Sequence, residues 1–308
     1  MLGSTAWVPE GGRYLHNQRI GLFVDVNERR LNPGFLYHLM NSAIVRQQIQ
    51  ATATGTKVKH TAPKRIGAVR VSLPPLDVQR RIADILSAYD QLIENNDRRM
   101  DLLEASIHLL YREWFVYLRL PGHERMEIVD GVPSGWRRAT VGSVLARAPT
   151  RRKVPKNEYQ QSGTIPTVDQ SRDFIGGYTD DISALYTAEH LPLVVFGDHT
   201  RILKFVDFPF ARGADGTQVL SPAPGAITPH FLYFALSAVD LSGFGHARHF
   251  KHLKAEEILV PTPPTVVAFD EIAQPALKQV SILREQNQQL REARDLLLPR
   301  LMDGRIRV

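Results

Sequence analysis

Polar and basic side chains follow short apolar segments in the second half of the chain, and their types suit contact with nucleic acid. The stretch "DQSRDF" follows "GTIPTV", "GDHTRILK" follows "LPLVVF", and "ARGADGTQV" is a third such loop. Arg, Gln, Thr and His side chains hydrogen-bond base edges in the major groove, whereas Lys and Arg neutralise phosphates. The candidate DNA contacts in these loops are Gln170, Arg172, His199, Thr200, Arg201, Lys204 and Gln218. Solvated polar turns are the alternative interpretation.

A basic loop of another kind occurs once in each half of the chain, between a short helical segment and a short apolar one. It reads "GTKVKHTAPKR" in the first half and "GHARHFKHLK" in the second. This recurrence favours phosphate contact, and the candidates are Lys57, Lys59, Arg65, Arg248, His249 and Lys251. We expect no metal at the histidines of the second loop, because the chain has no cysteine and the cluster no nearby carboxylate. The basic stretch 146–156 is interpreted as a flexible phosphate-binding arm or as a solvated loop.

The motifs of several enzyme classes are absent from the sequence. There is no GxxxxGK[ST] loop for nucleotide phosphates, and no Asn-Pro-Pro-Tyr or Asp-Pro-Pro-Tyr motif for adenine methylation. No Pro-Asp…Glu-x-Lys nuclease pattern is found either. The paired acids Asp180 and Asp181 are adjacent in a predicted turn, where surface acids are the simpler explanation. We therefore expect this chain to perform no catalysis and to bind no cofactor.

Composition narrows the class of protein further. The chain has 308 residues, a formal net charge of +6 and a pI of about 9.6, which suggests a polyanionic partner. It contains no cysteine and no apolar run approaching the ~20 residues that span a bilayer. The N-terminus does not have the pattern of a signal peptide. These features predict a soluble, cytoplasmic protein with no membrane partner.

Turn formers and strand-like or helical patterns divide the chain into five segments. Residues 1–75 contain the strand-like pieces "RIGLFVDV" and "IGAVRVSL" and one predicted helix, "PGFLYHLMNSAIVRQQIQ". Residues 76–118 form a long helical pattern, and 119–135 resemble a linker. Residues 136–264 hold four short strand patterns before the predicted helix "PHFLYFALSAV". Residues 265–308 form a second long helical pattern.

The two halves of the chain repeat one another. "PGFLYHLMNS" matches "PHFLYFALSA", and each half then continues with a basic loop, a short strand, a proline pair and a long helix. Such self-similarity indicates two copies of one module. The second copy has about 70 more residues before its short helix. The first copy is therefore expected to be a partial domain without its front half.

Both long helical patterns carry a heptad-like apolar stripe. In the first, the predicted seam breaks as a stutter between Asn96 and Met100; in the second it is continuous. The seam positions are Ile82, Ile85, Leu92, Asn96, Leu103 and Leu110 in the first helix, and Val280, Leu283, Asn287, Leu290 and Leu297 in the second. Helices of ~40 residues are ~60 Å long, so the natural partner of each stripe is the other helix. The alternative is two ordinary core helices of one domain.

Several long stretches resemble one protein family. "LPPLDVQRRIADILSAYDQLIENNDRRMDLLEASIHLLYREWFV" resembles the central region of specificity (S) subunits of type I restriction–modification systems. "FDEIAQPALKQVSILREQNQQLREARDLLLPRLMDGRI" resembles the equivalent region at their C-terminus. "VPSGWRRATVGSVL" is similar to the entry into their target recognition domains. The resemblance covers nearly the whole chain, and the pieces occur in the same order.

The resemblance implies an α+β fold, in which mixed α/β target recognition domains are joined by two long helices that pair as an antiparallel coiled coil. It implies that the domains read the halves of a bipartite duplex DNA target. The helices would set the gap and dock two methyltransferase (M) subunits, and restriction (R) subunits would join through the complex. The alternative is a truncated protein-interaction module that binds M subunits without selective DNA reading. A free-standing metal-dependent nuclease is a third and weaker hypothesis.

Overall fold

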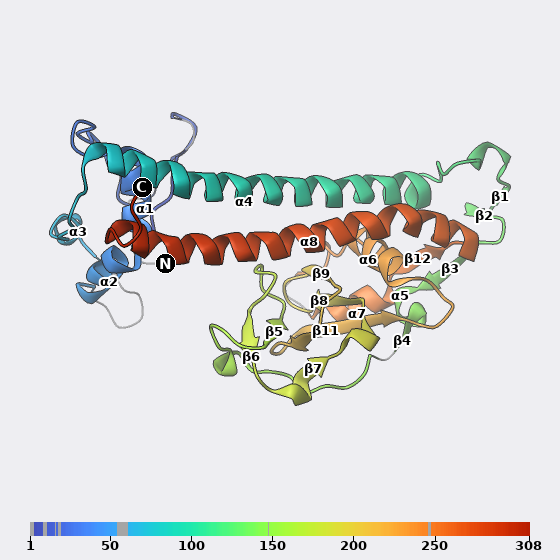
Figure 1. Cartoon of the computed structure of the whole chain (residues 1–308). Coiled ribbons are helices and arrows are strands. Elements are labelled where there is room, and N and C mark those ends of the chain that lie inside the picture. Colours follow the sequence, from blue (N-terminus) through green and yellow to red (C-terminus); the bar gives the residue numbers. More distant parts are fainter. Residues whose placement is uncertain are drawn as a thin grey trace. The chain divides into compact units, whose positions relative to one another are not determined.

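The computed structural model describes residues 3–8, 11–15, 17, 20–53, 61–146, 148–245 and 248–308. The chain forms two compact units (Figure 1). Unit 1 comprises Met1–Arg99 and Ile282–Val308, and unit 2 comprises Met100–Ser281. The long helices α4 (Leu76–Tyr111) and α8 (Pro263–Met302) each contribute to both units. Among the helices in the described ranges, none is long and apolar enough to cross a membrane.

Unit 1 is helical. Its short helices are α1 (Pro33–Asn41), α2 (Ala43–Ala51) and α3 (Pro63–Ile66). The single helix predicted over 33–50 is two helices, because Ser42 is extended and its hydroxyl caps α2 by accepting from the Val45 N–H. Asn32 caps α1 in the same way through the Phe35 N–H, at 2.9 Å.

The strand-like pieces predicted in residues 1–75 are not strands; in the described part of this segment no strand occurs. Ile20, Leu22 and Val24 are more than 60% exposed. A strand needs a hydrogen-bonded neighbour, and the described residues of unit 1 offer none to this segment. The alternating pattern of apolar residues alone was therefore insufficient to predict a strand.

The core of unit 1 joins α1 and α2 to the first part of α4 and the last part of α8. Phe35, Val45, Ile82 and Leu86 are fully buried in it, and Leu301 closes it from α8. Gln79 on α4 is also buried. Its side chain accepts from the Asn32 N–H and donates to the carbonyls of Arg30 and Pro74, which fixes the chain before α1 and at the proline pair.

The seam of α4 differs from the predicted one. Leu92 is 52% exposed, whereas its neighbour Ile93 is only 7% exposed, so the prediction for Leu92 is wrong. One heptad position is buried or half-buried throughout α4 and the π-helix that follows it, at Gln79, Leu86, Ile93, Met100, Ile107 and Trp114. This set needs no stutter, because Ile93 rather than Leu92 continues the heptad into Asn96 and Met100.

The other predicted seam positions are buried or half-buried. Buried positions are Ile82, Asn96, Val280, Leu283 and Asn287; half-buried ones are Ile85, Leu103, Leu110, Leu290 and Leu297. Within unit 1 the two helices run antiparallel, since Asp90 pairs with Arg294 and Asn96 with Asn287. The fold is α+β with an antiparallel pair of long helices.

Unit 2 contains the strands. Its elements before α6 are β1 (Ile128–Val129), β2 (Val132–Pro133), β3 (Arg137–Thr140), α5 (Val141–Val144), β4 (Leu145–Ala146), β5 (Ile165–Val168), β6 (Gly177–Thr179), β7 (Leu185–Tyr186), β8 (Leu193–Gly197), β9 (Leu203–Val206), β10 (Phe210–Arg212) and β11 (Thr217–Pro222). Then come α6 (Pro229–Ser237), α7 (His249–Ala255) and β12 (Glu257–Val260). Two sheets have four strands, ordered β6-β5-β10-β7 and β4-β11-β8-β9, while β1 pairs with β2 and β3 with β12.

Short one-turn helices complete the element list. They are the 3-10 helices His123–Arg125, Lys156–Glu158, Ile182–Ala184 and Ala188–His190, and the π-helix Arg112–Val116 that ends α4. The π-helix turns Trp114 and Phe115 inward, where they are 8% and 3% exposed.

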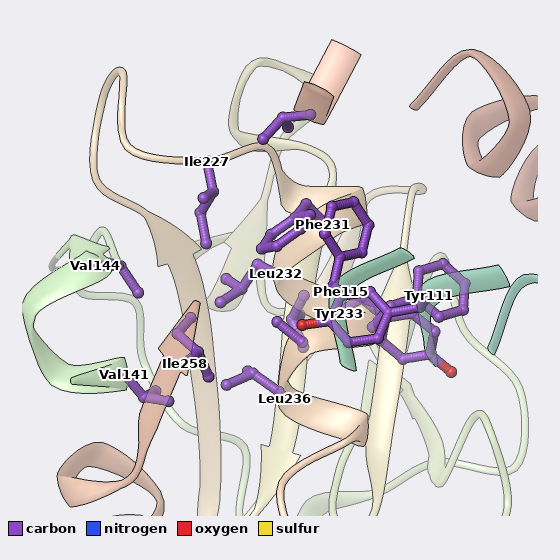
Figure 2. Packing of buried hydrophobic residues seen from close by; sticks show 14 of the residues in the cluster. Tyr111, Phe115, Val141, Val144, Ile227, Phe231, Leu232, Tyr233, Leu236 and Ile258 are labelled. Atoms are coloured by element: carbon purple, nitrogen blue, oxygen red, sulfur yellow. The ribbon is translucent and has the colours of Figure 1, made fainter. Parts of the chain in front are cut away.

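Helix α6 is the centre of the main core of unit 2. Figure 2 shows Phe231, Leu232 and Leu236 of α6 among side chains from α5, β12 and the end of α4. Phe269 of α8 is fully buried there and lies edge-on to Phe115, with ring centroids 5.3 Å apart. The cap of α6 repeats that of α1. Thr228 directly precedes Pro229, the first residue of α6, and its hydroxyl accepts from the Phe231 N–H. The sequence match between these two short helices thus corresponds to a shared N-terminal cap, whereas the strand β12 before α8 has no counterpart in the described residues before α4.

Candidate nucleic-acid interface

Three loops of unit 2 meet because of the strand order. Strands β5 and β10 are parallel, so the loops that follow them, 169–174 and 213–216, leave the same edge of their sheet. In the other sheet the end of β8 lies opposite the start of β11, with Gly197 paired to Thr217. The turn 198–202 after β8 therefore lies beside the loop before β11. We call these three segments the loop cluster.

Gln170 connects all three loops of the cluster. Its Oε1 accepts from the backbone N–H of His199 at 3.0 Å, and its Nε2 donates to the Asp215 carbonyl at 2.9 Å. Its own carbonyl accepts from the Thr200 hydroxyl at 2.7 Å. The cluster is therefore hydrogen-bonded across the three loops rather than formed of independent turns.

Gly216 makes this close approach sterically feasible. Its φ is +84°, and a Cβ there would lie 2.6 Å from Gln170 Nε2 and 2.7 Å from His199 Cδ2. Both the left-handed backbone and the missing side chain are needed at this position. The glycines of "ARGADGTQV" therefore form a turn that packs on Gln170 and His199.

Lys204 is not a DNA contact, contrary to the sequence prediction. It is 3% exposed, and its Nζ donates to the carbonyls of Asp169 and Asp173 at 2.7 and 2.6 Å. A buried ammonium needs such partners, and the loop 169–174 supplies them by wrapping around it. Lys204 thus holds the shape of the loop that carries Gln170 and Arg172.

Asp169 and Tyr159 extend this buried polar network. Burial acts to raise the pKa of Asp169, but hydrogen bonds from Ser171 and the charge of Lys204 lower it overall. The Tyr159 hydroxyl donates to Asp169 Oδ2 and accepts from the Ala214 N–H. Burial raises the pKa of Tyr159 to about 12, so it remains a neutral donor at neutral pH.

The other side of the turn 198–202 is fixed to α7. The carboxylate of Asp198 accepts from the Phe250 N–H, and its carbonyl accepts from the His249 N–H. The Arg201 guanidinium donates to His249 Nε2 at 3.2 Å and to the Phe244 carbonyl at 2.7 Å. His249 is 2% exposed, so the sequence prediction of a DNA contact at His249 is wrong. Burial, followed by the charge of Arg201, lowers the pKa of His249.

The remaining predicted DNA contacts of unit 2 differ in exposure. Arg172, His199, Thr200, Arg248 and Lys251 are exposed, whereas Gln170, Arg201 and Gln218 are half-buried. Gln218 lies in β11 opposite Phe196 rather than in a loop. The exposed residues remain candidate contacts.

The basic loop of unit 1 is described only in part. Arg65 in α3 is exposed, and its Nη1 donates to the Thr52 carbonyl at 2.6 Å. Lys57 and Lys59 lie outside the described residues. In unit 2, the stretch 146–156 is anchored where described, because Val154 is fully buried and Arg152 pairs with Glu158 and Asp181.

Sequence reasoning missed two surfaces. At the end of α4 and in the π-helix that follows it, three apolar side chains seven residues apart are each more than half exposed: Leu102, Leu109 and Val116. We call these three residues the outer stripe. Their spacing is a second heptad signal beside the seam. In unit 1 a cavity of about 550 Å³ is lined by groups that include Tyr37, His38, Asp90 and Arg294. Over the residues described, no cluster of three or more His, Asp or Glu side chains could hold a metal ion.

Comparison with known proteins agrees with this architecture. Residues 1–105 match the family model of the type I restriction modification DNA specificity domain. The type I restriction enzyme MjaIX specificity subunit of Methanocaldococcus jannaschii is 23% identical over an alignment of 299 residues that covers 89% of this chain and 69% of that protein. The EcoR124I/EcoR124II specificity subunit of Escherichia coli is 27% identical over 143 residues, 44% of this chain and 35% of that protein.

A solved structure shows the same fold. The S subunit of a type I restriction-modification system from M. genitalium superposes with a TM-score of 0.54 at 15% identity, covering 90% of this chain and 74% of that one. Together, the family-model match, the curated relatives and the fold support a specificity subunit of a type I restriction–modification system.

Proposed function

We propose that this chain is the DNA-recognition subunit of a type I restriction–modification complex and that partner subunits perform the catalysis. The match to the DNA specificity domain and the similarity to curated specificity subunits support the DNA-recognition role. The observation that carries the proposal in this molecule is the loop cluster, a hydrogen-bonded platform from which Arg172 and His199 project into solvent. Rigidly held polar side chains are what base readout requires, whereas the basic residues around them supply affinity without sequence information.

The basic loop before β12 suits phosphate contact. Arg248 and Lys251 are exposed at the start of α7, which Asp198 and Arg201 tie to the loop cluster. Phosphate contacts fix the register of a protein on the duplex, so base-reading and phosphate-binding side chains need to be rigidly connected. The Asp198 and Arg201 hydrogen bonds are such a connection.

A second part of the proposal concerns the spacing of the DNA target and the partner subunits. We propose that the paired α4 and α8 set the gap in a bipartite target and that M subunits dock against them. The outer stripe supports docking, since Leu102, Leu109 and Val116 form an exposed apolar face of the kind that a partner covers. R subunits would join through this complex.

The DNA-reading proposal is tested by selection. The chain is co-purified with its cognate M subunit, and bound duplexes are recovered from a random pool and sequenced. A split motif with a fixed gap supports the whole proposal, and a single half-site supports reading by unit 2 alone. Retention of the M subunit with no enriched sequence would favour the alternative, a protein-interaction module without selective reading.

Docking is tested separately with charge substitutions. Leu102→Asp together with Leu109→Asp should abolish co-purification with the M subunit, because two carboxylates cannot be buried unpaired in an apolar interface. The matched control is Ile182→Asp, which alters an exposed apolar residue of unit 2 outside the helices. Retention of the M subunit by the double variant would show that the outer stripe is not the docking face.

A further inference from the structure

The amide of Gln170 is directed inward. A glutamine that reads adenine presents Oε1 and Nε2 together to the base edge. In this chain Oε1 accepts from the His199 N–H and Nε2 donates to the Asp215 carbonyl. Gln170 is also only half-exposed, between the loops that it joins. Reading a base with this amide would release two loops of the cluster.

The side chain of His199, in contrast to that of Gln170, is exposed to solvent. The backbone N–H of His199 is held by Gln170, and its Cδ2 lies close to the position that a side chain on Gly216 would occupy. An imidazole ring has two nitrogens that can hydrogen-bond, which suits a base edge in the major groove. The neighbouring Thr200 hydroxyl already donates to the Gln170 carbonyl, so His199 is the freer polar group of this turn.

The turn is also held from the side of α7, independently of Gln170. Asp198 accepts from the Phe250 N–H at 2.8 Å, and Arg201 donates to His249 and to the Phe244 carbonyl. Loss of the Gln170 amide contacts should therefore reorient the tip of the turn without detaching it from the domain.

We propose that His199 is a specificity-determining residue of unit 2 and that Gln170 is a positioning residue acting through it. The proposal rests on the proposed function and deepens it, since it names which side chain of the loop cluster meets a base. Gln170, the more obvious reader by residue type, acts on DNA only by fixing the His199 backbone.

The test is a double-mutant cycle in the complex with the M subunit. The variants are His199→Ala, Gln170→Met and the two combined. For each, affinity is measured for the selected target, for targets with one base pair changed, and for an unrelated duplex. Methionine keeps the length of glutamine without its hydrogen bonds. Thermal unfolding is followed in parallel.

His199→Ala should lower discrimination at one base-pair position by about tenfold and leave binding to the unrelated duplex unchanged. Gln170→Met should lower discrimination at the same position, and the double variant should be no worse than His199→Ala alone. Multiplicative losses, or losses at two different positions, would mean that Gln170 reads a base itself and would overturn the proposal. Unchanged discrimination in His199→Ala would overturn it as well.

A second variant covers the case in which Gln170→Met does not fold. Gln170→Glu keeps the acceptor for the His199 N–H but loses the donor to Asp215, so a smaller loss at the same position is expected. An effect of Gln170→Glu at another position contradicts the proposal. If the wild-type complex selects no sequence at all, the proposed function itself fails. If the wild type selects a sequence and the His199→Ala variant selects it equally well, only the proposal for His199 fails.

Discussion

Asn96 Nδ2 donates to Asn287 Oδ1 at 2.9 Å inside the helix pair of unit 1. Asn287 Nδ2 in turn donates to the Ile93 carbonyl and to Asp97 Oδ1. Both asparagines are buried, in seams that are otherwise mostly apolar. Such a polar layer is satisfied in only one register of the two helices, because sliding either helix would bury its amides without partners.

Replacing one of these asparagines should therefore destabilise unit 1. For Asn287→Leu we expect a loss of about 1–3 kcal/mol, because Asn96 is left buried without its acceptor. The double variant Asn96→Leu/Asn287→Leu should recover most of this loss, since both polar groups are then removed. Urea unfolding of the three variants measures the coupling. Arg291→Ala, which removes an exposed pair with Asp97, is the control and should cost less than about 1 kcal/mol. Additive losses in the double variant would contradict a coupled pair.

Lys204→Met should destabilise unit 2 and disorder the loop 169–174. The backbone carbonyls of Asp169 and Asp173 lose their donor, and we expect a loss of roughly 3 kcal/mol. The control is Lys251→Met, an exposed lysine on α7, for which we expect a change within about 0.5 kcal/mol. Chemical denaturation measures both, and amide exchange of residues 169–174 reports the loop directly. Equal stability of the two variants would contradict a structural role for Lys204.

Phe269→Ala should be among the most destabilising single substitutions in unit 2. Its ring is fully buried and lies edge-on to Phe115, Phe231 and Phe234. Truncation leaves a cavity in an aromatic cluster that cannot easily collapse, so we expect a loss of about 3–5 kcal/mol. Val267→Ala, two residues earlier and 55% exposed, is the control and should have little effect. Thermal unfolding of the two variants distinguishes the outcomes.

Acidification should destabilise unit 1 through His38. Burial lowers the pKa of His38; the Asp90 carboxylate opposes this shift, and Arg294 adds to it. Because the folded pKa lies below the unfolded value of about 6.5, the unfolded chain binds the proton first as the pH falls. Stability should therefore decline from about pH 6.5 down to the folded pKa.

The measurement is urea unfolding between about pH 8 and pH 5 for the wild type and for His38→Gln. The variant should show a weaker pH dependence. His108→Gln provides a comparison in unit 2, because burial also lowers the pKa of His108. An unchanged pH profile in His38→Gln would show that His38 does not contribute to the acid sensitivity.

Much of the architecture follows from local sequence. The continuous heptad of α8, the proline pair at the start of each long helix, and the Asn32 and Thr228 caps depend on residues within one or two turns, so the helices and the repeated pattern were predictable. Some strands of unit 2 were also predictable, because apolar runs such as Leu193–Gly197 are bounded by turn formers; the short strands β1–β4, β6 and β7 were not predicted. The loops that follow them could be located for the same reason.

Tertiary structure decided which side chains in those segments face outward. Leu92 and Ile93 are adjacent and both apolar, and only the partner helix selects Ile93. Arg201 and Lys204 are basic residues of a polar stretch of sequence, yet both turn inward because carbonyls more than 30 residues away in the chain lie within hydrogen-bonding reach. Gln170 and His199 are both polar residues that could hydrogen-bond a base, and the sequence does not distinguish them. Only the meeting of three loops directs the Gln170 amide inward and leaves the His199 side chain exposed. Such long-range contacts carry no local sequence signature, so the sequence determined the elements and the fold determined the site.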